Sequence, residues 1–182
     1  MPDRAKPPQG QPDDSQSYLV AADDADAWTT ATADQYGSQQ LLGVETIDPT
    51  PRLATALRLG PSEQVVVRRR LMSLRGKPVE IANSYYPASL AAGTPLAEQA
   101  KIRGGAPRAL EALGAKVAYA DEDVELEASP SQAEAELLQI SQATRVVRLF
   151  RTAYTATDLP VEVADSVIIP AGRKLRHRIT VS

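Results

Sequence analysis

A short segment that occurs twice constrains the fold of this chain more than any other feature. PVEIANS spans residues 78–84 and PVEVADS spans residues 160–166, and five of the seven positions are identical. Each copy follows a strand-like segment that begins with valines and an arginine, and a helix-like segment precedes each of these strands. Two similar helix–strand–strand units predict an α+β domain with a largely antiparallel sheet and internal pseudo-twofold symmetry.

The first unit carries clear signals for where its elements begin and end. Thr50 is a suitable N-cap, Pro51 suits the first helical position, and Gly60 is a typical residue just after a helix. These residues predict a helix over 50–60. The strands that follow it, 64–74 and the repeated segment, are joined by Arg-Gly-Lys and form a hairpin.

The second unit repeats this order. Ser129 is the expected N-cap of its helix, Pro130 lies in the first turn, and Gln132 stands at the capping-box position. Strands over 144–155 and 160–169 then form a second hairpin, with a turn slightly longer than that of the first.

Other elements lie outside the two units. In the strand over 116–128, acidic residues alternate with a side that we expect to be buried at Val124 and Leu126. Residues 1–17 are rich in Pro, Gln, Asp and Ser and predict a disordered linker or tail, which leaves 18–182 as one domain. The remaining predicted elements are a helix over 24–37, a strand over 38–48, a long ordered loop over 88–105, a helix over 106–113 and a last strand over 174–181.

Composition excludes several kinds of chemistry. The chain has no cysteine, so it can form neither disulfides nor thiolate sites, and its one histidine makes His-rich metal sites and Ser-His-Asp catalysis improbable. We expect no metal and no cofactor. A net charge of −3 with interspersed signs gives no reason to expect direct binding to nucleic acid. The chain shows no signal peptide and no apolar run long enough to cross a bilayer, which predicts a cytoplasmic protein.

Strand alternation divides the repeated segment between two faces of the sheet. Val79 and Ile81 should share the face that packs under helices, and so should Val161 and Val163. The opposite face then presents an acid and small residues from each copy: Glu80, Ala82 and Ser84 from the first, and Glu162, Ala164 and Ser166 from the second. This second face is either an ordinary solvated surface or a polar cleft in which both glutamates face a shared ligand.

Arginines supply candidate partners for such a ligand. Alternation places Arg68 and Arg70 on one side of their strand and Arg69 on the other. Each of these arginines is a solvated residue, a cross-strand partner for an acid, or a ligand contact. Arg103 precedes the glycine pair that ends at Gly105, and the amides at the start of the next helix favour an anion.

Two aromatic residues fit packing roles better than ligand roles. His177 is in phase with apolar residues of the last predicted strand, and Trp28 is expected to anchor the first predicted helix to the core.

Together, two motifs resemble a known family. The first hairpin contains R-x-x-x-x-x-G-x-P-V followed by SY-x-P, and the second contains R-T-x-Y followed by P-V-E. Their order and spacing, over roughly residues 25–181, resemble the UTRA domain, the effector-sensing module of GntR-type transcription regulators of the HutC subfamily. The resemblance implies a chorismate-lyase-like fold with a ligand pocket between the sheet and helices, and dimerisation through this module.

The resemblance also implies roles for single residues. Arg70 matches a family arginine that contacts the effector, Glu162 matches a pocket glutamate, and Ala82 stands where sugar-phosphate sensors have an acid, with Glu80 as a possible substitute. Tyr154 belongs to the R-T-x-Y motif and completes the candidate ligand-binding set. Other family polar positions differ in this chain, at Met72, Gly105, Pro107 and Ile168. These departures argue against an amino-sugar phosphate and favour a more apolar organic effector with one acidic group, held by Arg70 or Arg103.

Three functions follow as hypotheses. The first is an effector-sensing, dimerising domain without catalysis, whose contact with DNA requires a winged-helix domain that is absent from these 182 residues. The second is an enzyme of the chorismate lyase type, built on Arg70 and Glu162. The third is a stand-alone modulator that pairs with a complete regulator.

Overall fold

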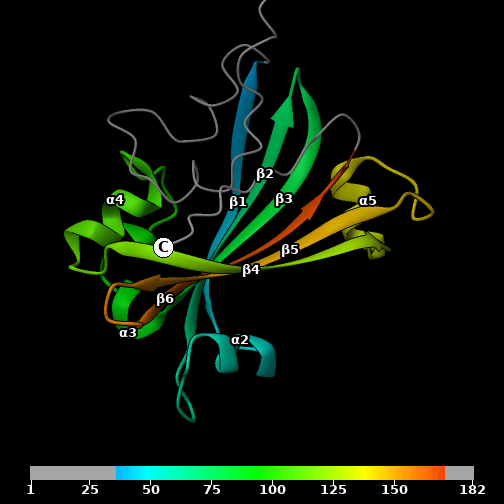
Figure 1. The fold of residues 1–182 in the computed structure, drawn as a ribbon. Coiled ribbons are helices and arrows are strands. Elements are labelled where there is room, and N and C mark those ends of the chain that lie inside the picture. The colour runs from blue at the N-terminus through cyan, green and yellow to red at the C-terminus, as the bar shows by residue number, and fades with distance from the viewer. Residues whose placement is uncertain (1–35, 171–182) are drawn as a thin grey trace, which may run out of the picture.

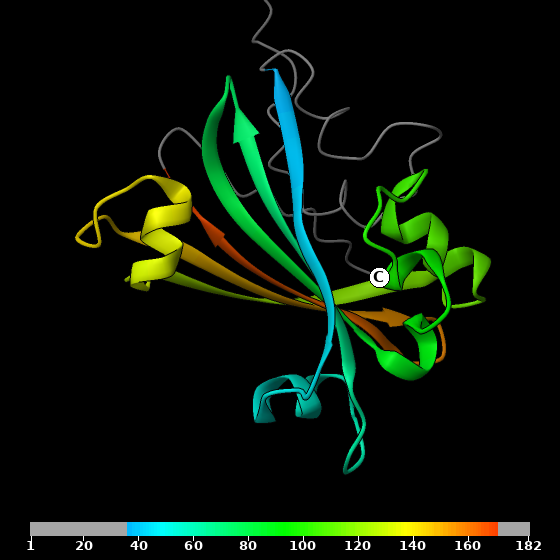
Figure 2. The ribbon, with the colours of Figure 1, turned by 180° about the vertical axis from the view of Figure 1, so that it is seen from behind.

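Six strands form a single antiparallel sheet in the order β1-β2-β3-β6-β5-β4 (Figure 1). The computed structural model describes residues 36–170. The strands are β1 (Gly37–Ile47), β2 (Val65–Leu74), β3 (Lys77–Pro87), β4 (Val117–Ala128), β5 (Val146–Thr155) and β6 (Pro160–Ile168). Figures 1 and 2 show that β1–β3 run in a different direction from β4–β6, so the sheet is strongly twisted. The predicted α+β class with a largely antiparallel sheet is confirmed.

The two copies of the repeated segment meet at the centre of the sheet. They form β3 and β6, which pair antiparallel with Asn83 opposite Asp165. Since these two residues hold the same position in the two copies, a pseudo-twofold axis passes between them. Each hairpin extends outward from this centre, through β2 to β1 on one side and through β5 to β4 on the other.

A β-bulge lies near the start of each copy and corrects one sequence prediction. Met72 pairs with Glu80 but Ser73 pairs with Pro78, and likewise Ala153 pairs with Glu162 but Tyr154 pairs with Pro160. The extra residue is the valine of each Pro-Val-Glu. A bulge breaks the strict alternation of side chains.

The two valines therefore do not share a face with the next apolar residue. Val79 packs with Met72 and Ala82, whereas Ile81 joins a different cluster. Val161 and Val163 are divided between separate clusters in the same way.

Helices cover both faces of the sheet. On one face, α2 (Pro51–Ala56) contributes Leu53 to a cluster with Phe150, and α5 (Gln132–Leu138) contributes Leu138 to a cluster with Ile81. We call this the α2/α5 face. On the other, the α4 face, the segments α3 (Ala88–Ala91), η3 (Pro95–Ala97) and α4 (Gly105–Ala112) pack against Val66 and Tyr86. The segment predicted as an ordered loop thus contains α3 and η3.

Both repeat helices differ from prediction at one end. Thr50 caps α2 as expected, accepting a hydrogen bond of 3.3 Å from the Leu53 amide. The helix ends earlier than Gly60, because Arg58 adopts a positive φ of 53° and turns the chain. In the second unit the N-cap is Ser131 rather than Ser129. Ser131 forms a capping box with Glu134, which suits the three-residue spacing that this motif requires.

Strand β4 also departs from expectation. Both residues of the side that was expected to be buried are more exposed than predicted: Val124 is half-buried, and Leu126 is 68% exposed. The register between β4 and β5 shifts after Glu125, which breaks the alternation on which the prediction rested.

Several predictions fall outside the described residues. These are the tail over 1–17, nearly all of the helix over 24–37 with Trp28, and the strand over 174–181 with His177. Within residues 36–170, no helix has the length and apolar character needed to cross a membrane.

Candidate ligand-binding site

Arg70 is a central group on the α4 face of the sheet. It projects from β2 beside Ala82 of β3, and its Nη2 donates a hydrogen bond of 2.9 Å to Ser84 Oγ. Its Nε is buried and has no hydrogen-bond partner among the described residues. A buried guanidinium donor without an acceptor is costly, because it has lost water without gaining a replacement. Arg70 therefore offers a donor that an incoming anionic group can satisfy.

Glu162 lies on the same face, held by Tyr86. The Tyr86 hydroxyl donates a buried hydrogen bond of 2.9 Å to Glu162 Oε1. Burial, with the neighbouring charge of Glu162 as the second cause, raises the pKa of Tyr86 far above its ordinary range. Tyr86 consequently stays neutral and keeps its proton as a donor. It is the only described residue that donates a hydrogen bond to Glu162, which is itself 7% exposed.

Arg68 organises the segment that covers this end of the face. Its Nη1 donates to the carbonyl oxygens of Pro95, Leu96 and Glu98 at 3.2, 3.1 and 2.7 Å, and its Nη2 donates to that of Ala100 at 2.7 Å. Burial lowers the pKa of Arg68, but these charge-assisted bonds replace the lost hydration. The segment around η3 is thereby tied to β2.

Apolar side chains also lie on the face around Arg70. Met72 and Ala82 form a buried cluster, and Ile168 and Leu149 are buried on the neighbouring strands β6 and β5. Two positions at which the family sensors carry polar groups, Met72 and Ile168, are thus 2% and 7% exposed here. A ligand beside Arg70 meets the apolar side chains of Met72 and Ala82, with Glu80 next to them.

The two repeated glutamates share this face but lie far apart along it. Glu80 pairs with Ile168, and Glu162 lies six residues from Ile168 along β6, which corresponds to roughly 20 Å. Both carboxylates are 7% exposed. The structure links Arg70 to Ser84 and Glu162 to Tyr86, and it places Glu80 on the other side of Ala82, two residues from this direct partner of Arg70.

Arg151 is the pseudo-symmetric counterpart of Arg70. Arg70 pairs with Ala82 and Arg151 pairs with Ala164, and these alanines hold the same position in the two repeats. On the outer side, however, Arg151 faces Glu122 of β4, and the two side chains form a buried ion pair at 3.4 Å. Arg70 faces Leu41 of β1 instead. The second half of the sheet thus contains a neutralised arginine, and the first half contains one without a facing carboxylate.

Arg103 and Gly105 lie at the start of α4. Gly104 and Gly105 both have a φ of +77°, a left-handed conformation that favours glycine, and this explains the pair. Arg103 is exposed, and it also has an interaction partner. Both residues lie outside the buried group around Arg70.

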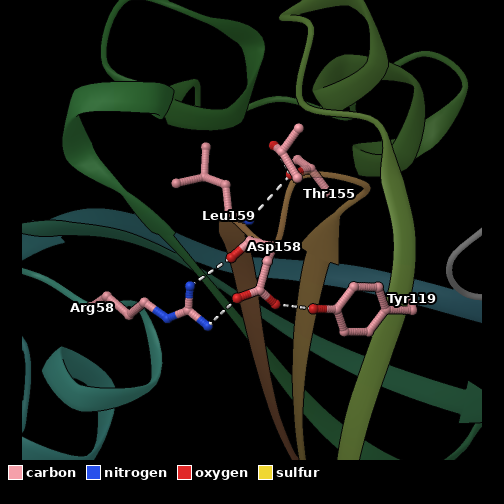
Figure 3. A network of polar contacts seen from close by, with 6 residues as sticks. Arg58, Tyr119, Thr155, Asp158 and Leu159 are labelled. Atoms are coloured by element: carbon pink, nitrogen blue, oxygen red, sulfur yellow. Dashed lines mark hydrogen bonds and ion pairs between the residues drawn. The ribbon is translucent and has the colours of Figure 1, made fainter.

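Tyr154 lies on the opposite face. Its ring stacks on Tyr119 at 5.0 Å between centroids, and the Arg58 guanidinium lies 5.6 Å from the Tyr154 centroid. Figure 3 shows the adjoining polar network, in which Asp158 of the β5–β6 turn receives hydrogen bonds from Arg58 and Tyr119. This network joins the end of α2 to the turn. The structure therefore separates Tyr154 from Arg70.

Sequence reasoning missed the partners of these residues. Arg68 was expected to face solvent, an acid or a ligand, and it binds main-chain carbonyl groups instead. Tyr86 was in phase with Ser84, and this alternation was the signal that could have placed it beside Glu162. The pairing of Arg151 with Glu122 requires the register between β4 and β5, which no local pattern supplies.

Solved structures share this fold and define its class. The ligand-binding domain of a GntR-family transcriptional regulator from Bordetella bronchiseptica superposes with a TM-score of 0.72 at 22% identity, over 80% of this chain and 90% of that one. The effector domain of PhnF from Mycobacterium smegmatis gives 0.72 at 20% identity, over 85% and 94%. The fold is that of effector domains of GntR-family regulators.

The chain belongs to the UTRA domain family, whose model matches residues 35–170. It is also similar to an uncharacterized HTH-type transcriptional regulator, SCO4628 of Streptomyces coelicolor, at 31% identity over 133 residues. This chain spans about half of that relative, 49% of its length, and the match covers 71% of this chain. The function that the family and the fold support is an effector-sensing regulatory domain, and they do not favour a chorismate-lyase-type enzyme.

Proposed function

We propose that this chain senses a small organic effector for a GntR-type regulator of the HutC subfamily, without catalysing a reaction. In this proposal the domain forms a homodimer in the cytoplasm, and DNA is contacted through a winged-helix domain. The support is the family match, together with a relative that is about twice as long and is named as an HTH-type regulator.

The effector carries one acidic group, and Arg70 binds it. The observation that carries this proposal is the buried Arg70 Nε, which lacks an acceptor although Nη2 is held in place by Ser84. An anionic oxygen at Nε satisfies that donor with a charge-assisted hydrogen bond, worth about 1.5–3 kcal/mol. The cost of leaving Nε unpaired is present only in the empty site, so ligand binding removes it.

The body of the effector is apolar, with one hydrogen-bond donor. Met72 and Ala82 supply apolar surface beside Arg70, and Glu80 lies between Met72 and Ile168 on the same face. Glu162 accepts one hydrogen bond from Tyr86, and its carboxylate can accept another from an N–H or O–H group of the ligand. Glu80 and Ser84 lie on the same face, and Arg103 and Gly105, at the start of α4, are further candidate contacts of the effector.

A thermal-shift experiment tests this assignment. Benzoate, butyrate and phenyl phosphate serve as acidic probes, and benzyl alcohol serves as the neutral comparison. A ligand that binds only the folded state raises the melting temperature by mass action. We expect at least one acidic probe to raise it in the wild type, and benzyl alcohol to have no effect.

Two arginine variants make the test specific. Arg70→Met should abolish the shift produced by the acidic probe. Arg69→Met is the matched control, since Arg69 is the next residue in the chain but projects from the other face, where it pairs with Glu45 at 2.9 Å. Equal protection of the wild type and the Arg70→Met variant would show that the acidic group binds elsewhere.

Dimerisation is tested separately. Light scattering coupled to gel filtration should give twice the chain mass of 19.5 kDa. A monomer at all concentrations would contradict this part of the proposal and would leave the ligand assignment intact.

A further inference from the structure

A second polar cluster lies on the α2/α5 face, opposite the Arg70 site. Its centre is Asn83 and Asp165, which face each other across β3 and β6 on the pseudo-twofold axis. Directly opposed residues of neighbouring strands have Cβ atoms about 4.5–5.5 Å apart. Tyr85 follows two residues after Asn83 on the same face, and Phe150 is the neighbour of Asp165 on β5. Helices α2 and α5 pack on this face to either side.

The cluster contains two hydrogen-bond acceptors that lack donors. Asn83 Oδ1 is buried and unpartnered among the described residues. The Asp165 carboxylate, which is half-buried, receives no hydrogen bond and forms no ion pair within that part of the chain. Burial raises the pKa of Asp165, and this agrees with a carboxylate that has lost water without gaining a donor. Buried acceptors are normally satisfied, so Asn83 Oδ1 requires an explanation, and the half-buried Asp165 beside it has no donor among the described residues either.

The arginines around Asp165 do not supply the missing donor, because each one is engaged by another acid. Arg148 donates to both oxygens of Glu134, at 3.1 and 2.7 Å. Arg69, the β2 neighbour of Asn83, pairs with Glu45 at 2.9 Å. Arg52 lies 3.7 Å from Asp123 and 3.7 Å above the centroid of Phe150. Asp165 lies within the electrostatic reach of Arg148 and Arg52, which lower its pKa against the effect of burial, but it forms no ion pair with either of them.

We propose that Asn83 and Asp165 form a second small-molecule site that binds a primary ammonium group. An ammonium group has three N–H donors and one positive charge, which matches two unsatisfied acceptors, one of them anionic. The Tyr85 hydroxyl is a third acceptor on the same face. An anion is disfavoured because Asp165 already places a negative charge there. This site is separate from the Arg70 site, since the two project from opposite faces of the sheet.

The test uses ethylammonium as the probe and the side-chain amide resonances of Asn83 as the readout. Ethylammonium should shift these resonances in the wild type. Asp165→Asn should weaken this binding by about tenfold or more, since a hydrogen bond to a charged group contributes about 1.5–3 kcal/mol. Asp165→Asn removes a charge from a desolvated position and is not expected to unfold the protein. Asp165→Glu, which keeps the charge but moves it, serves as the second variant and should retain part of the binding.

Two controls separate this proposal from its competitors. Tetramethylammonium has the charge but no N–H donor, so it should leave the Asn83 resonances unchanged; a response equal to that of ethylammonium would overturn the proposal. Arg70→Met should bind ethylammonium as the wild type does. Loss of binding in that variant would place the amine on the α4 face and overturn the proposal. It would also be overturned if Asn83 donated its amide proton to Asp165 in the ligand-free protein, since the pair would then be satisfied.

Discussion

The two halves of the sheet contain equivalent arginines in different electrostatic surroundings. Arg151 in the second half is buried and paired with Glu122 from the edge strand β4. Arg70 in the first half meets Leu41 at the equivalent position on β1, and it keeps an unpartnered Nε. A single difference in the outer strand thus separates a structural ion pair from a candidate ligand contact. A repeat can keep one copy for stability while the other copy is left open for binding.

The largest expected effect contrasts the two arginines directly. Arg151→Met removes the ion pair with the largely buried Glu122 and should lower the free energy of unfolding by about 3–5 kcal/mol. Arg70→Met removes the unpaired Nε donor together with one hydrogen bond to Ser84, and these two effects oppose each other, so it should change stability by less than about 1 kcal/mol. Urea denaturation of both variants measures the contrast. Equal losses would show that Arg70 is also a structural residue.

The second prediction concerns a substitution that gives Arg70 the same kind of acidic neighbour that Arg151 has. Leu41→Glu places a carboxylate opposite Arg70, as Glu122 is placed opposite Arg151. A double-mutant cycle with Arg70→Met should give a coupling energy of about 1–2 kcal/mol. The same variant should no longer be stabilised by acidic probes, because Arg70 is then occupied. Stabilisation by benzoate that survives Leu41→Glu would contradict the role assigned to Arg70.

The third prediction concerns the pair on the pseudo-twofold axis, where one half has Asn83 and the other has Asp165. Burial raises the pKa of Asp165 above its ordinary value of 3.8, so the folded state binds this proton more tightly than the unfolded state does. The stability that this tighter proton binding contributes is fully present below the pKa of Asp165 in the unfolded chain. It is lost as the pH rises through the pKa of Asp165 in the folded protein.

Asp165→Asn removes this dependence. The variant should therefore gain stability relative to the wild type between acidic and neutral pH, with a smaller effect than in the two preceding predictions. Urea unfolding at several pH values measures it. A difference between variant and wild type that stays constant with pH would show that Asp165 titrates normally.

The smallest effect lies at the tip of the second hairpin. The hydrogen bond to Asp158 is the main cause that raises the pKa of Tyr119 to about 12 (Figure 3). Asp158→Asn should lower that pKa toward the ordinary tyrosine value of 10.0. Ultraviolet absorbance of the phenolate follows the titration, with Tyr119→Phe to assign the signal. Stability should hardly change, because the groups of this network are exposed.

The sequence predicted the sheet and its symmetry well because both follow from local patterns. The repeated segment, the turn residues and the capping residue Thr50 are each readable without knowledge of the fold. The bulges at Val79 and Val161 were not predictable in this way. They show only in the pairing register, and alternation alone assigned these valines to the wrong face.

The candidate site was predictable in part. Strand phase placed Ser84 and Glu162 on one face and grouped Arg70 with Arg68, but it did not relate the arginines to that face, which the strand register does. The partners of these residues depend on contacts between distant segments. The carbonyl groups around Arg68 come from a segment that has no regular periodicity. Leu41 and Glu122 can be identified as the neighbours of the two arginines only when the strand order is known.

Arg68 connects the segment around η3 to strand β2, which also carries Arg70. Its guanidinium holds the segment around η3, and Arg70 is two residues further along the same strand and points to the same side. An anion that binds Arg70 therefore contacts the same strand that holds the segment around η3 in place. The Arg70 site and the segment around η3 are thus connected through two positions of one strand.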